Sequence, residues 1–164
     1  MPMTPISLAN EITDAMGFPA PPSPQLIGWA TGCIIELSGK GLATTGGIPG
    51  PHKITGISGP SMAAIVASVG GYGLITPQLI GECTGIMTHI MTAANVVYVA
   101  PPPVAGNPDW FIGGKISGMS GPAMATLVAL FTGFPIPTPD LIKKCTAIVD
   151  HIEKNALVNN GKIQ

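Results

Sequence analysis

The sequence predicts a mainly α-helical protein with short β-arms. In this fold class, three diverged helix-turn-helix repeats pack around one core, and Gly/Pro-rich, β-hairpin-like segments link them. Three observations lead to it: an internal duplication, a helix-start signal that occurs three times, and an apolar stripe after each signal. We expect a single domain over residues 1–164. Its repeats span about 3–40, 58–95 and 120–158, and its linking arms span about 41–57 and 96–119.

The duplication aligns two parts of the chain at a fixed offset, without a gap. Residues 53–63 read Lys-Ile-Thr-Gly-Ile-Ser-Gly-Pro-Ser-Met-Ala, and residues 115–125 read Lys-Ile-Ser-Gly-Met-Ser-Gly-Pro-Ala-Met-Ala. The same register aligns 76–84 with 138–146. A third, diverged copy lies near the N-terminus, where 23–32 resembles 76–85. Such self-similarity is the sequence signature of a repeated supersecondary unit.

Each repeat is expected to contain a shorter helix followed by a longer one. The shorter helices span about 6–16, 60–69 and 122–131 and end at or beside a glycine. Ser23, Thr76 and Thr138 then supply a hydroxyl that can cap the next helix, and a proline follows each of them. Proline costs nothing at the first helical position, because the N–H that it lacks would have no partner there.

The longer helices are predicted to be amphipathic. Their apolar residues recur at the i, i+3, i+4, i+7 spacing of one helix face. Burying each large side chain of such a stripe is worth about 1.5–3 kcal/mol before entropy is subtracted. The stripes consist of Leu26, Ile27, Ala30, Cys33, Ile34 and Leu37; of Leu79, Ile80, Cys83, Ile86, Met87, Ile90 and Met91; and of Leu141, Ile142, Cys145, Ile148, Val149 and Ile152.

Both linking arms read as two short strands joined by a turn rich in Pro and Gly. We expect strands near 42–45 and 52–55 in the first arm, and near 96–99 and 110–112 in the second. The C-terminal residues 160–163 resemble 114–116, which indicates that the third repeat begins an arm of its own.

Charge is unusually sparse. Charged residues make up 9% of the chain, arginine is absent, and only six charges fall between residues 15 and 139. Because interface cores are depleted of charge, this pattern favours a surface covered by neighbouring proteins over a monomer coated with Ser, Thr, Gly and Pro. The near-neutral balance without a basic stripe argues against nucleic-acid binding. No export signal and no membrane-spanning run of about 20 apolar residues are visible.

The sequence offers no catalytic signature, and we predict no catalytic residue, no cofactor site and no metal site. The run Gly56-Ile57-Ser58-Gly59 is one residue short of GxSxG and leads into a helix, which favours a structural turn. Cys33, Cys83 and Cys145 are expected to be small buried hydrophobic residues. His89 and His151 share one repeat position with Glu36 and are predicted to lie on the polar side of their helices, exposed or at an interface. Each histidine follows a cysteine by six residues, and this spacing places the two side chains on different faces of the helix. The histidine and its cysteine therefore cannot bind the same metal ion.

The second arm carries the best candidates for contact with a partner. It concentrates aromatic and proline side chains, which anchor interfaces and lose little entropy on docking. The candidate partner-binding residues are Tyr98, Pro101, Pro102, Pro103, Trp110 and Phe111.

Low charge, Gly/Pro-rich arms and a duplicated helical hairpin, with segments such as 114–119 and 76–80, together resemble the small structural proteins of tailed-bacteriophage virions. The resemblance is one of style and implies a cement, neck or baseplate-type protein. Its function would be non-enzymatic assembly, in homo- or hetero-oligomeric contact with other structural proteins of the virion, without nucleic acid or membrane. It would be assembled in the host cytoplasm. The alternatives are a small-ligand or metal-binding domain, possibly an enzyme, and a membrane-active protein.

Overall fold

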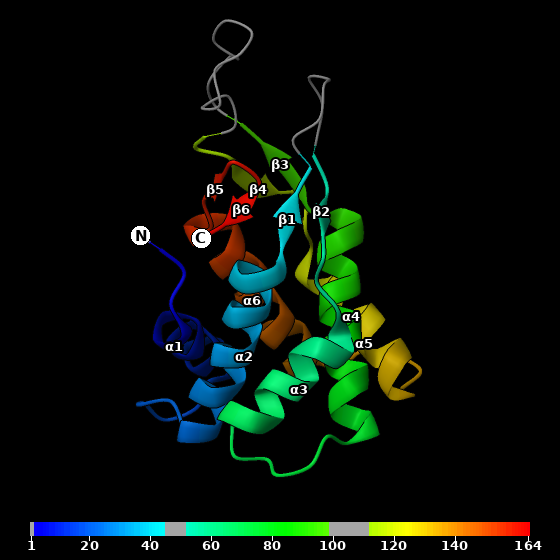
Figure 1. The fold of residues 1–164 in the computed structure, drawn as a ribbon. Coiled ribbons are helices and arrows are strands. Elements are labelled where there is room, and N and C mark those ends of the chain that lie inside the picture. The colour runs from blue at the N-terminus through cyan, green and yellow to red at the C-terminus, as the bar shows by residue number, and fades with distance from the viewer. Residues whose placement is uncertain (1, 45–51, 99–111) are drawn as a thin grey trace, which may run out of the picture.

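The computed structural model describes residues 2–44, 52–98 and 112–164, and these form a mainly helical structure with small antiparallel sheets (Figure 1). The predicted fold class is confirmed at this level. The helices are α1 (Pro5–Met16), α2 (Pro24–Lys40), α3 (Gly59–Val69), α4 (Pro77–Ala93), α5 (Gly121–Thr132) and α6 (Pro139–Asn155). The strands are β1 (Leu42–Ala43), β2 (Ile54–Thr55), β3 (Asn95–Val97), β4 (Lys115–Ser117), β5 (Val158–Asn159) and β6 (Lys162–Ile163).

Every helix of the described residues begins with the same local chemistry. A Ser or Thr precedes it in extended conformation, and the hydroxyl accepts a hydrogen bond from the backbone N–H three residues later. A proline occupies the first or second helical position in all six. The capping hydroxyl satisfies a backbone N–H that would otherwise lack a partner. The proline has no N–H, so it adds no unsatisfied donor to the first turn. The predicted starts of the longer helices at Pro24, Pro77 and Pro139 are therefore confirmed.

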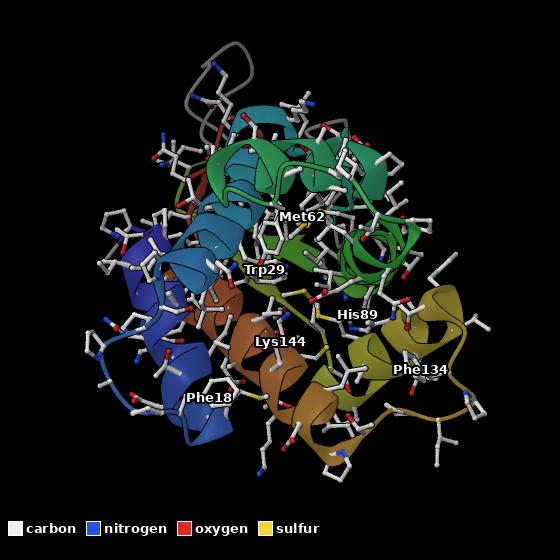
Figure 2. All side chains as sticks on the ribbon, turned by 90° about the horizontal axis from the view of Figure 1, so that it is seen from below. Phe18, Trp29, Met62, His89, Phe134 and Lys144 are labelled. Carbon is white, nitrogen blue, oxygen red and sulfur yellow. The ribbon has the colours of Figure 1, made fainter. Side chains whose placement is uncertain are left out.

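The helices form a closed ring. Each packs against the helix that precedes and the helix that follows it, and α6 packs against α1. Figure 2, which looks along this ring from below, shows the helices arranged around a common centre. The shorter helices α1, α3 and α5 run away from the strands, and α2, α4 and α6 return to them (Figure 1). We call the end formed by the three turns, residues 17–23, 70–76 and 133–138, the loop end, and the opposite end the strand end.

The strands also connect in a cycle at the strand end. The antiparallel pairs β1–β2, β3–β4 and β5–β6 each join neighbours in the chain, and β1 additionally pairs with β6. Single bridges connect His52 with Val96 and Gly114 with Val158, which joins the β2 side to β3 and the β4 side to β5. The C-terminal segment thus forms a complete hairpin.

The strand pairing differs in part from the prediction for the second arm. The strand expected near 110–112 falls mostly outside the described residues, and Ile112 is not in a strand. Instead β4, which is closer to the next helix, pairs with β3. Val96 and Ile116 face each other in this pair, and both are buried in the core. Burial of these two side chains explains the position of the strand.

Glycines allow the helices to approach closely at two contacts. A Cβ on Gly32 of α2 would lie 3.1 Å from the Cα of Val66 on α3, and 2.4 Å from a side-chain methyl of the same residue. A Cβ on Gly85 of α4 would lie 2.5 Å from the Cα of Val128 on α5. Gly28 and Gly81, one turn earlier, are equally close to the backbone of the facing helix. The long helices therefore bury a face made of small residues, in addition to the predicted apolar stripe.

The prediction that Glu36, His89 and His151 lie on an exposed polar side is wrong. Their exposed fractions are 0%, 5% and 0%. Glu36 follows Gly28 and Gly32, and His89 follows Gly81 and Gly85, at four-residue steps that keep them on one helix face. This face packs against the next helix, which buries the polar residue along with the glycines.

These buried polar residues bind the start of the next helix. Glu36 accepts hydrogen bonds from the Ser58 N–H at 2.8 Å and from the Ser61 hydroxyl at 2.7 Å. His89 Nε2 accepts the Ser120 N–H at 3.0 Å. Both acceptors thus satisfy backbone or side-chain donors at the N-terminus of α3 or α5, where negative charge and lone pairs are favoured. His151 Nδ1 instead lies 3.2 Å from Glu11 Oε1 on α1.

Among the helices of the described residues, none combines the length and the apolar character needed to cross a membrane.

Candidate functional site

The loop end concentrates exposed apolar side chains. Nine of the fourteen large hydrophobic residues that are exposed within the described residues lie in its turns or directly before them. They are Phe18, Val69, Tyr72, Leu74, Ile75, Leu130, Phe131, Phe134 and Ile136. Each of the three turns contributes an aromatic ring, and Figure 2 shows two of them, Phe18 and Phe134, on either side of the ring centre. Apolar side chains exposed together at one end of a molecule mark interaction sites more often than isolated exposed residues do.

The turns of the loop end carry no charge. Residues 17–23, 70–76 and 133–138 contain no Asp, Glu, Lys, Arg or His. The charged residues that flank them most closely in the chain are Asp14 and Asp140, both exposed acids. The surface is thus apolar with an acidic border, and it lacks basic residues in its turns.

One residue from each long helix meets near the centre of the ring. Trp29, Glu82 and Lys144 each lie six positions after the capping residue of α2, α4 and α6. Lys144 forms an ion pair with Glu82, and its ammonium lies 4.2 Å from the centroid of the Trp29 ring. Figure 2 shows Lys144 and Trp29 side by side in the middle of the ring. The Trp29 indole N–H is buried and has no hydrogen-bond partner among the described residues.

Lys144 keeps its charge in the central ion pair. Burial by itself lowers the pKa of the Lys144 ammonium, but the Glu82 carboxylate outweighs burial, and the pKa lies above its ordinary value. The side chains of Lys144 and Glu82 retain 20% and 24% of their exposure. The pair is therefore a partly hydrated charged site within an otherwise apolar end of the molecule.

The three cysteines lie in the core around this pair. Cys33, Cys83 and Cys145 are buried, free thiols, as the sequence predicts. Burial raises the pKa of each thiol to about 12. Because only the thiolate is strongly nucleophilic, these residues stay protonated and unreactive at neutral pH.

A cavity of about 350 Å³ reaches the ion pair from the loop end. Glu82 and Lys144 line it together with the apolar side chains of Met16, Val128, Leu141, Phe134 and Ile136. Gln78, Thr132, Thr138 and Asp140 complete the lining. Apolar walls with a few converging polar groups are typical of small-ligand pockets, and the volume falls in their usual range.

A second, wider groove follows the contact between α1 and α6 and has a volume of about 850 Å³. Lys143 and Ala147 on α6 stand where the facing surfaces of α2 and α4 have glycines. Four acids and two lysines line the groove: Glu11, Asp14, Asp150, Glu153, Lys143 and Lys154. Glu153 accepts the Met119 N–H at 2.9 Å, so part of this charge serves the fold.

The partner-binding residues predicted from the sequence lie mostly beyond what the structure describes. Pro101, Pro102, Pro103, Trp110 and Phe111 are outside the described residues. Tyr98 is described; it is half-buried, packs against the core and makes an edge-on ring contact with His52 at 5.3 Å. Its role in partner binding stays a prediction.

The sequence analysis predicted neither the loop end nor the central trio, the group of Trp29, Glu82 and Lys144. The signal for the loop end was present, since each turn pairs an aromatic residue with Gly or Pro and omits charge. The trio could also have been found, because the three residues occupy one position of the aligned segments 23–32, 76–85 and 138–146. Within the described residues, no group of three or more His, Cys, Asp or Glu side chains is placed to hold a metal ion.

No protein-family model, no curated protein and no solved structure matches the chain.

Proposed function

We propose that this chain is a non-enzymatic assembly protein that docks onto neighbouring protein subunits of a large particle such as a phage virion. The observation that carries the proposal is the loop end, where three turns without a charged residue expose apolar side chains. Desolvating such a surface is favourable, and its composition is that of the core of a protein interface.

The proposal includes a repeat architecture of three diverged helix-turn-helix units. Its support is the shared start chemistry of the helices, the alternation of shorter and longer helices, and a strand pair after each long helix. The contact of each long helix with the next short one, including that of α6 with α1, is the contact that a threefold arrangement requires. Three similar turns then form one end of the molecule.

A protein partner explains the loop end better than a lipid surface does. Surfaces that bind anionic lipids use Lys and Arg, each worth about 1 kcal/mol near the membrane. The turns contain neither, and the flanking residues Asp14 and Asp140 are acidic. Protein interfaces instead favour aromatic residues and deplete charge at their centre, as the turns do.

The test replaces one strongly exposed residue in each turn, in the variant Phe18→Ser/Leu74→Ser/Ile136→Ser. These side chains are 54%, 77% and 74% exposed, so their loss should leave helix content and the melting temperature nearly unchanged. We expect the unmodified chain to associate with rising concentration in sedimentation velocity, and the variant to stay monomeric.

A matched control replaces three exposed hydrophobic residues outside both the loop end and the second arm, in Ile6→Ser/Ile35→Ser/Leu42→Ser. Their exposed fractions are 56%, 42% and 52%, so the control also lowers the hydrophobicity of the surface. It should associate like the unmodified chain. A chain that remains monodisperse and monomeric at high concentration, with both variants behaving identically, would contradict the proposal.

The second candidate function, a small-ligand-binding domain, is favoured by one observation. The cavity at the loop end leads to a half-buried ion pair and has apolar walls. In this candidate function the ligand binds the free chain, and no assembly is required.

A further inference from the structure

The charged groups in the loop-end cavity are unevenly balanced. Glu82 and Asp140 contribute two carboxylates to its lining, and Lys144 contributes one ammonium. Lys144 is already committed to Glu82 and to the face of the Trp29 ring. The cavity therefore has a net charge of about −1 at neutral pH, which favours a cationic group.

The carboxylates keep acceptor capacity for a ligand. The pair with Lys144 uses Oε1 of Glu82, which leaves Oε2 to accept from another donor. Asp140 is largely exposed at the mouth, and its contact with the exposed Lys143 is a loose 3.8 Å. A contact of that length between exposed groups is weak and easily replaced.

The remaining lining suits an alkyl stem and an ammonium head. Met16, Val128 and Leu141 form apolar walls, and Ile136 and Phe134 belong to the turn at the mouth. Aliphatic walls bury methylene groups at about 0.8 kcal/mol each, and an aromatic ring attracts a cation to its face. A carboxylate ligand, by contrast, would have to compete with Glu82 for Lys144 and lie beside Asp140.

We propose that the loop-end cavity binds a primary ammonium group on an alkyl stem, with Glu82 Oε2 and Asp140 accepting its N–H groups. Two sources share this chemistry: a lysine side chain of a docking protein and a free alkylamine. The inference rests on the second candidate function, whose ligand chemistry it names, and it does not depend on assembly because the ligand binds the free chain.

The test is a titration of the full isotopically labelled chain with n-butylammonium chloride, followed by ¹H–¹⁵N correlation spectra. Butyrate and butanol at matched ionic strength are the comparison probes. We expect saturable shifts at Glu82, Lys144 and the Trp29 indole N–H, with butylammonium binding about tenfold more tightly than either comparison probe. Equal or tighter binding of butyrate, or no shift at these residues up to tens of millimolar, would overturn the proposal.

Two variants locate the head group. Glu82→Gln keeps the shape of the side chain and should weaken butylammonium binding about tenfold, since it removes a charge-assisted hydrogen bond. Asp140→Asn changes an exposed residue in the first turn of α6, and should weaken binding severalfold even if Glu82→Gln proves unstable. Asp150→Asn, an exposed acid in the α1–α6 groove, is the control and should bind like the unmodified chain. Unchanged affinity in Asp140→Asn and in a folded Glu82→Gln protein would contradict the assignment.

Two further probes separate the sources. Nα-acetyl-lysine methylamide carries a four-carbon stem that ends in a peptide backbone, whereas n-hexylammonium carries a longer free stem. A lysine side chain as natural ligand predicts that the lysine derivative matches butylammonium and that hexylammonium gains nothing. A free amine as natural ligand predicts that the lysine derivative binds more weakly than butylammonium. It also predicts that hexylammonium binds more tightly, because affinity rises with each added methylene group.

Discussion

Glu36 illustrates how a charged side chain without exposed surface is stabilised in this ring. Its carboxylate receives two donors from the start of α3, and Lys40 lies 3.6 Å away on its own helix. A buried carboxylate without such partners would cost several kcal/mol, so the contact fixes how α2 and α3 meet. His89 does the same for α4 and α5 with a neutral ring nitrogen.

The burial of His89 gives unfolding a specific pH dependence. Burial lowers its pKa below the ordinary value of 6.5, so the unfolded chain takes up the proton at a higher pH than the folded one. The neutral His89 ring contributes its full stabilisation at pH values above the unfolded pKa. This stabilisation is lost as the pH falls toward the pKa of the folded state. We expect the free energy of unfolding to decrease between about pH 7 and about pH 5. Urea titrations should show a smaller decrease for His89→Gln, which keeps an acceptor but does not titrate; an equal decrease would contradict this role.

Gly85 permits a helix contact that a methyl group would prevent. Because its Cβ would lie 2.5 Å from the Val128 Cα, Gly85→Ala must push α4 and α5 apart and should lower the free energy of unfolding by about 1–3 kcal/mol. Gly39→Ala is the matched control: Gly39 lies in α2 with no atom near its would-be Cβ, so alanine should stabilise the helix by about 0.5 kcal/mol. Denaturant unfolding measures both, and equal effects would show that close packing is not the cause.

At the scale of elements, helix starts were predictable and helix surfaces were not. The hydroxyl-plus-proline signal at Ser23, Thr76 and Thr138 is local chemistry, and it located the starts of the longer helices to the residue. The second buried face of those helices depends on which helix packs there, which no local pattern states. The sequence does contain a pattern that indicates this face: two glycines and one polar residue at four-residue spacing. Because the glycines let the next helix approach closely, the polar residue on the same face, Glu36 or His89, is buried as well.

The strand cycle also depended on tertiary context. Strands of two or three residues carry little signal, and the pairing of β1 with β6 joins segments from opposite parts of the chain. Trp29, Glu82 and Lys144, which meet at the centre of the ring, are likewise far apart in sequence, since each lies in a different repeat. Equivalent positions in the duplication were the information that could have brought them together.

Closure of the strand cycle should contribute measurably to stability. Removing residues 157–164 deletes β5 and β6, whose Val158 and Ile163 side chains are 0% and 1% exposed. Each buries an apolar side chain worth about 1.5–3 kcal/mol, so we expect the free energy of unfolding to fall by at least about 3 kcal/mol. Circular dichroism should still report a helical protein, and an unchanged denaturation midpoint would show that the cycle is dispensable.

At the scale of the whole molecule, the sparse charge of the chain is distributed unequally. The groove between α1 and α6 holds six charged side chains, whereas the loop end holds none in its turns. The second predicted contact element, the arm of residues 96–119, begins with β3 at the strand end. A protein that used both ends for different contacts would assemble head to tail rather than as a closed twofold dimer.

Residues 101–108 of the arm are predicted to serve assembly and not folding. Deleting residues 101–108 keeps β3 and β4, whose pairing then closes over a shorter connection, so the free energy of unfolding should change by no more than about 1 kcal/mol. Size-exclusion chromatography should show that assembly is lost while circular dichroism retains the helical signal. Loss of helicity together with assembly would instead assign the segment to the fold.

The direction of the chain through the ring has a practical consequence. α1 begins and β6 ends at the strand end, on the same side of the molecule (Figure 1). A fluorescent reporter or surface tether attached to either terminus would thus leave the turns of the loop end on the side away from the attachment. When the protein is immobilised in that orientation, all molecules expose their loop end to the solution, which suits experiments that capture binding partners.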